Sequence, residues 1–142
     1  MSNYESFWDL GRYAVVGHSE KKPFPMLSYR ALKQAGKTVF AVDPSASTID
    51  GDPACADLAS LPEEVDGVIL EVPREETASW VEQAHERQIE HLWIHMGRDT
   101  PEALGLARKH GINVRSGTCA VMYLQGGFHS VHKWINKAIG KY

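Results

Sequence analysis

Short apolar runs alternate with helical segments along this chain, and that alternation constrains its fold more than any other feature. The runs are rich in valine, isoleucine and aromatic residues and lie at 13–17, 38–42, 67–72, 91–96 and 112–115. Apolar runs this short are typical of strands that are covered on both faces of a sheet.

Helix start and stop signals mark the segments between these runs. Gly36 and Gly111 stand where the residue just past a helix is expected, and Thr100-Pro101 joins a capping side chain to a proline at the first helical position. We therefore expect helices at 27–35, 74–87 and 101–110, with flanking helices near 5–10 and 128–139. Repeated strand–helix–strand units with short connections predict right-handed crossovers.

Together these patterns predict one domain over residues 1–142. Its expected architecture is a three-layer, Rossmann-like, doubly wound α/β fold with a mainly parallel sheet of about five strands. Segment 45–62 is the exception, because it is long and rich in small and turn-forming residues. We expect it to cross the carboxyl edge of the sheet with a short strand or a helical turn.

Composition and charge exclude several classes of function. The chain has 142 residues with 15 Lys+Arg, 18 Asp+Glu and a net charge of −3, so it lacks the basic balance of nucleic-acid-binding proteins. No apolar run approaches the ~20 residues that span a bilayer, and the N-terminus lacks a secretory signal pattern. Two cysteines are too few for a disulfide framework. These observations predict a soluble, cytoplasmic protein with no nucleic-acid or membrane partner.

Ligands of open parallel sheets bind outside the carboxyl ends of the strands, where the strand order reverses. The loop after the first run, Gly17-His18-Ser19, has a glycine that lets a ligand approach the backbone, and Lys21 and Lys22 follow it. The helix expected from residue 27 would point its positive end at the same place. The loop lacks the Gly-x-Gly-x-x-Gly turn of dinucleotide sites and predicts a ligand with more dispersed phosphates. An ordinary strand–helix loop is the alternative.

A set of short motifs in a fixed order resembles a known family. Gly17-His18-Ser19, followed after a gap by Ser28-Tyr29-Arg30 and Gly36, resembles the small stand-alone CoA-binding domain proteins. The same domain forms the amino-terminal part of the succinyl-CoA synthetase α subunit. The resemblance continues through Val42-Asp43-Pro44, 58–62, Val65-Asp66, 93–97 and Cys119.

The resemblance implies a coenzyme A (CoA) site at the carboxyl edge. It implies phosphate contacts for Gly17, Ser19 and the Ser28-Tyr29 pair, charge neutralisation by Lys21 and Lys22, and a pantetheine path beside Met96-Gly97. The nucleotide part would lie against Asp43-Pro44 and Val72-Pro73. The candidate ligand-binding residues are Gly17, His18, Ser19, Lys21, Lys22, Ser28, Tyr29, Arg30, Asp43, Pro44, Val72, Pro73, Met96, Gly97 and Cys119.

Two of the candidate side chains have alternative roles. Cys119 either attacks a CoA disulfide as a thiolate or packs as a small buried residue. His95 either acts as an acid or base on a thioester or is a structural, hydrogen-bonded histidine. On a strand, His91 and His95 are ~13 Å apart, too far to share one metal ion, and no metal site is predicted.

The sequence shows no nucleophile–base pair, metal cluster or Walker loop, which favours a non-catalytic CoA or acyl-CoA binding protein without deciding whether it is an enzyme. One alternative is an NAD(P)-binding sensor or small oxidoreductase in which Asp43 accepts hydrogen bonds from a ribose. The other is a scaffold, or a subunit of an acyl-CoA ligase, that has lost the ligand. The acyl group, the protein partner and the oligomeric state, a homo-oligomer included, stay open.

Overall fold

The computed structural model describes residues 7, 9–21, 24–95 and 98–118, and their strands form one mostly parallel sheet. The strands are β1 (Arg12–Val16), β2 (Thr38–Val42), β3 (Thr48–Ile49), β4 (Asp52–Cys55), β5 (Gly67–Leu70), β6 (His91–His95) and β7 (Asn113–Thr118). Their order across the sheet is β3-β4-β2-β1-β5-β6-β7, and of these neighbouring pairs only β3 and β4 run antiparallel.

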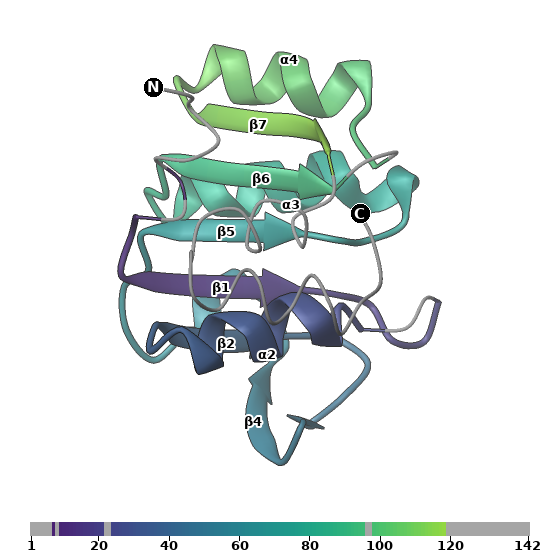
Figure 1. The fold of residues 1–142 in the computed structure, drawn as a ribbon. Coiled ribbons are helices and arrows are strands. Elements are labelled where there is room, and N and C mark those ends of the chain that lie inside the picture. Colours follow the sequence, from purple (N-terminus) through teal and green to yellow (C-terminus); the bar gives the residue numbers. More distant parts are fainter. Residues whose placement is uncertain (1–6, 8, 22–23, 96–97, 119–142) are drawn as a thin grey trace.

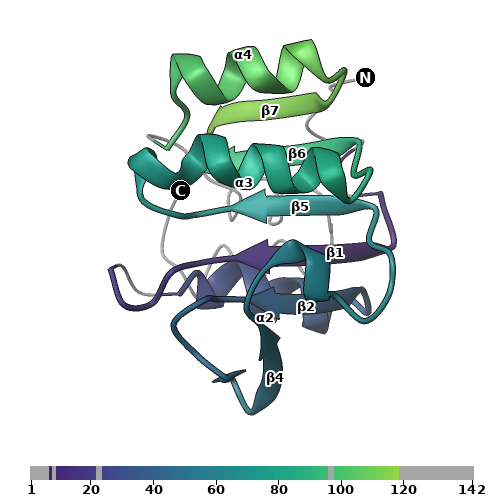
Figure 2. The same ribbon diagram turned by 180° about the vertical axis from the view of Figure 1, so that it is seen from behind.

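The helices cover both faces of this sheet. They are α2 (Met26–Gln34), α3 (Arg74–Glu86) and α4 (Pro101–Lys109), with a 3-10 turn, η1 (Leu58–Ser60). Helix α2 lies in front of the sheet in Figure 1, whereas α3 lies behind it and comes to the front in Figure 2. The three-layer, Rossmann-like α/β fold that the sequence predicts is confirmed. Among the described residues, no helix combines the length and the apolar character that a membrane span requires.

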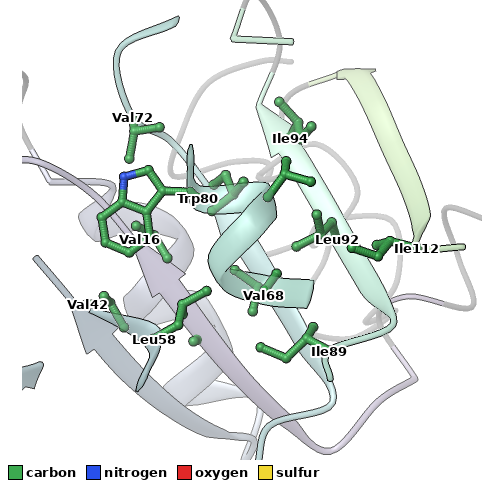
Figure 3. Packing of buried hydrophobic residues seen from close by; sticks show 14 of the residues in the cluster. Val16, Val42, Leu58, Val68, Val72, Trp80, Ile89, Leu92, Ile94 and Ile112 are labelled. Carbon is green, nitrogen blue, oxygen red and sulfur yellow. The ribbon is translucent and has the colours of Figure 1, made fainter. Parts of the chain in front are cut away.

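The strands in the middle of the sheet, β1, β2, β5 and β6, are apolar at most positions because successive side chains enter opposite buried layers. In β1, Ala14 and Val16 join the core beneath α3 and α4, whereas Tyr13 and Val15 join the core beneath α2. Figure 3 shows the first of these cores, with Trp80 of α3 packed over the strands. Burial on both faces explains why the strand runs read as continuous hydrophobic stretches.

The sheet has seven strands, so the expectation of about five is too low. Both additional strands come from segment 45–62, where β3 and β4 form a hairpin around Asp50 and Gly51. These two residues have φ angles of 54° and 81°, and positive φ at both central positions is what a type I′ hairpin turn requires. The Asp-Gly pair is thus a hairpin signal that the sequence carries, although the flanking strands are too short to show an alternating pattern.

The expected helix boundaries agree with the structure to within one or two residues. Thr100 Oγ1 accepts a hydrogen bond from Ala103 N at 3.0 Å, and Pro101 takes the first helical position of α4. Gly36 and Gly111, past the ends of α2 and α4, have φ angles of 82° and 72°. These left-handed conformations are the reason for glycine at helix ends. Half of the helix expected near 5–10 (residues 5, 6 and 8) and the whole of the one expected at 128–139 lie outside the described residues.

Candidate functional site

The strand order reverses between β1 and β5. From β1 the chain continues to β2 and β4 on one side, and then crosses back to β5, β6 and β7 on the other. The ladder between the two central strands extends past their ends, because Glu71 N donates to Val16 O at 3.0 Å. Helices α2 and α3, which follow these strands, leave to opposite faces (Figures 1 and 2). Such a switch point is the usual ligand crevice of open α/β sheets.

The end of the β1–α2 loop packs closely against Gly17, the residue that follows β1. A Cβ on this residue would lie 2.7 Å from Phe24 Cδ1 and 2.7 Å from Pro25 Cδ. The loop turns between His18 and Lys21, where Lys21 N donates to His18 O at 2.8 Å. Glycine at position 17 is therefore required by packing within the protein, independently of any ligand.

Asp43 joins the loops that follow β1 and β2. It is fully buried, and its carboxylate accepts hydrogen bonds from Ser19 N at 3.1 Å and Ser45 N at 2.7 Å. Pro44 beside it is exposed. The structure thus brings Asp43 to the first loop, as expected from the sequence, where it organises the backbone of that loop.

Glu76, near the start of α3, contacts two side chains of the same loop, His18 and Lys21. Its Oε2 lies 2.7 Å from His18 Nδ1 and 3.1 Å from Lys21 Nζ. Burial alone would raise the pKa of Glu76, but its hydrogen bonds with His18, Lys21 and Trp80 outweigh burial and lower the pKa. The β1–α2 loop is therefore joined to α3 across the switch point by a hydrogen bond from His18 and an ion pair from Lys21.

A hollow of about 290 Å³ lies where the loops after β1, β5 and β6 meet. It is lined by Lys21, Pro73, Arg74, Glu75 and Arg98. Lys21 is paired with Glu76, but within the described part of the chain neither Arg74 nor Arg98 forms a salt bridge. Three cations line this hollow against one carboxylate, Glu75, and such an excess of positive charge is suited to binding an anion. The sequence reasoning missed both arginines, although each directly follows a predicted loop motif, Val72-Pro73 or Met96-Gly97.

Glu71, another residue that the sequence reasoning missed, directly follows β5 and lies two residues before Pro73 of this hollow. Its Oε2 accepts a hydrogen bond from Ser28 Oγ at 3.3 Å, and its Oε1 lies 3.5 Å from His95 Nδ1. Burial raises the pKa of Glu71 to about 7, opposed by the hydrogen bond from Ser28 and the charge of Arg98. Burial and the same Arg98 charge lower the pKa of His95. The signal for Glu71 was its position, a charged residue between Leu70 and Val72 at the carboxyl edge.

A model of the CoA binding domain family matches residues 11–125, which is most of the sequence. The chain belongs to this family.

Solved structures share the fold of this CoA binding domain. A hypothetical protein from Pyrococcus horikoshii OT3 matches with a TM-score of 0.77 at 21% identity, over 85% of this chain and 87% of that chain. A protein from Thermus thermophilus matches with a TM-score of 0.74 at 23% identity, over 88% and 94%. The apo form of a dinucleotide-forming acetyl-coenzyme A synthetase from Ca. Korarchaeum cryptofilum matches with a TM-score of 0.63 at 18% identity. That match covers 79% of this chain and 27% of the synthetase.

The structure brings part of the predicted residue set together at the switch point of the CoA binding domain. Gly17, His18, Ser19, Lys21, Ser28, Asp43 and Pro73 lie in or beside the loops described above. Val72 is instead fully buried in the core with Trp80 (Figure 3). Lys22, Met96, Gly97 and Cys119 lie outside the described residues.

Tyr29 and Arg30 face the β3–β4 hairpin. The Tyr29 hydroxyl donates to Asp52 Oδ2 at 2.7 Å, and Arg30 Nη2 donates to Asp50 Oδ1 at 2.9 Å. Tyr29 also lines a larger hollow, of about 510 Å³, between α2, β2 and β4. The structure does not bring this pair to the hollow of Lys21, Arg74 and Arg98, and their contact with phosphate stays a prediction.

Proposed function

We propose that this protein binds CoA or an acyl-CoA at the carboxyl edge of its sheet, in the crevice between β1 and β5, as a non-catalytic binding protein. One observation carries the proposal. Lys21, Arg74 and Arg98 come from loops that follow different strands and converge on one hollow, and among described residues the two arginines have no salt-bridge partner. This arrangement suits the phosphates of CoA.

Local charge is needed because the protein and its ligand are both negative. The chain has a net charge of −3, and CoA carries several phosphate charges. Exposed charges act over about 10 Å at 0.1 M salt, so the cations that attract the ligand must lie at the site itself. The hollow meets that requirement, because Lys21, Arg74 and Arg98 line it.

Membership in the CoA binding domain family supports this choice of ligand. The NAD(P) alternative depended on Asp43 accepting hydrogen bonds from a ribose. In the structure this carboxylate is fully buried and already accepts the amides of Ser19 and Ser45, which does not favour that role.

Calorimetric titration with CoA and, separately, NAD tests the proposal. We expect CoA to bind, and Arg98→Ala to weaken that binding about tenfold or more, since a charge-assisted hydrogen bond contributes about 1.5–3 kcal/mol. Arg108→Ala is the matched control, because Arg108 is an exposed arginine on α4 that does not line the hollow. Equal affinities of the two variants would move the phosphates elsewhere. A protein that binds neither nucleotide would support the scaffold alternative.

A further inference from the structure

Three different elements, β1, α2 and β6, contact Glu71. Its backbone N–H donates to Val16 of β1, its Oε2 accepts from Ser28 of α2, and its Oε1 faces His95 of β6. The remaining charge that acts on it is Arg98, in the segment after β6. The Glu71 side chain is 17% exposed, so its carboxylate is mostly removed from water.

Both protonation states of Glu71 have a partner in this arrangement. The ionised carboxylate accepts from the Ser28 hydroxyl. His95 Nδ1 is buried and has no hydrogen-bond partner among the described residues, but it lies 3.5 Å from Glu71 Oε1. Burial and Arg98 lower the pKa of His95 and so favour its neutral ring, whose unprotonated nitrogen can accept the proton of a carboxylic acid. A small movement therefore lets Glu71 hold a proton.

Arg98 connects this group to the anion hollow. Its side chain lines the hollow, and its positive charge stabilises the ionised form of Glu71. An anion on Arg98 neutralises that charge and adds negative charge close to the carboxylate. Both effects favour the protonated form of Glu71.

We propose that Glu71 is the proton-accepting residue of the ligand site, so that an anion bound at Arg98 is taken up together with a proton. The inference rests on the proposed function for the identity of the ligand. It assigns to Glu71 the sensitivity of CoA binding to pH: the affinity falls as Glu71 ionises, because binding must first return the proton.

Calorimetry of the parent protein and of Glu71→Gln tests this inference. Titrations with CoA at pH 7–8, in HEPES and in Tris at equal ionic strength, give the number of protons taken up from the difference in observed heat. We expect the parent to take up about half a proton to one proton more than the variant, since glutamine does not titrate. Between pH 6 and pH 8 the affinity of the parent should fall several-fold relative to the variant, up to about tenfold if only the protonated form binds.

The variant also serves as the control for the ligand. Any protons that the phosphates of CoA take up on binding are the same for the two proteins, so they cancel when the proton uptake of the variant is subtracted from that of the parent. Equal proton uptake and parallel pH profiles, with CoA bound by both proteins, would overturn the inference and leave the proposed function intact. Failure of both proteins to bind CoA at every pH would overturn the two together.

Discussion

Glu71 Oε1 lies 3.5 Å from His95 Nδ1 across the ends of β5 and β6. The strand register produces this pair. Leu70 of β5 is aligned with Ile94 of β6, so the next residues of the two strands are neighbours that face the opposite layer. Leu70 and Ile94 enter the core beneath α3. Glu71 and His95 therefore face α2, where Ser28 donates a hydrogen bond to Glu71. Parallel pairing thus places titratable groups together at the edge where ligands bind.

The raised pKa of Glu71 predicts a pH-dependent stability. Between its ordinary pKa near 4.5 and its folded pKa of about 7, the folded chain keeps a proton that the unfolded chain releases. This stabilisation is fully present below pH 4.5 and is lost as the pH rises through 7, a change of about 3 kcal/mol at 1.36 kcal/mol per pKa unit. Urea unfolding of the parent and of Glu71→Gln across this range measures it. A constant difference in stability between the two proteins at all pH values would contradict the prediction.

The close packing around Gly17 predicts that a side chain at this position destabilises the fold. Gly17→Ala should destabilise the fold by about 1–3 kcal/mol, because the added Cβ would sit 2.7 Å from Phe24 and Pro25 in the loop. Gly105→Ala is the matched control, since nothing lies within 4 Å of its Cβ and alanine should favour α4 by up to about 1 kcal/mol. Thermal unfolding followed by circular dichroism compares them, and equal melting temperatures would show that the loop rearranges freely.

The hydrogen bonds of Asp43 predict that removing its carboxylate loosens the loops after β1 and β2. Asp43→Ala removes the acceptor of the Ser19 and Ser45 amides, which should cost about 2 kcal/mol of stability. Ser19→Ala keeps the backbone N–H that bonds to Asp43 and should stay within about 0.5 kcal/mol of the parent. Denaturant unfolding gives both values, and amide hydrogen exchange should speed up at residues 19 and 45 in the first variant only. Unchanged exchange at these amides would mean that Asp43 does not hold the loops together.

The fold was predictable because its signals are local. The strands are short apolar runs, and the helix ends at Gly36, Gly111 and Thr100 act within a few residues. The short strand or helical turn expected in segment 45–62 is present as β4 and η1, but the pairing of β3 with β4 was not predicted, because these strands are too short for a periodic pattern. Because the hairpin was not predicted, the contacts of Tyr29 and Arg30 were not predicted either: their partners, Asp52 and Asp50, belong to the hairpin.

The site was predictable in outline only. Parallel strands bring their following loops to one edge, so the sequence placed Gly17, Asp43 and Pro73 near one another. Partners that join distant segments, such as Glu76 with His18 or Glu71 with His95, depend on how helices pack and on which strands are neighbours. Loop composition does not encode these pairings. Arg98 was missed for the same reason, because its importance comes from the residues that it faces.

Lys21 and Arg98 line the same hollow but should contribute unequally to CoA binding. Lys21 Nζ lies 3.1 Å from Glu76 Oε2, so its charge is already largely neutralised, whereas Arg98 has no salt bridge with any described residue. Lys21→Ala should therefore weaken CoA binding only a few-fold, because solvent screens an exposed ion, against tenfold or more for Arg98→Ala. Glu76→Gln should strengthen binding, because it releases the charge of Lys21 toward the ligand.

Calorimetry at several salt concentrations measures these affinities, and the salt dependence should flatten more in Arg98→Ala than in Lys21→Ala. A loss in Lys21→Ala as large as that in Arg98→Ala would show that the ligand displaces Glu76 and takes Lys21 as a full partner.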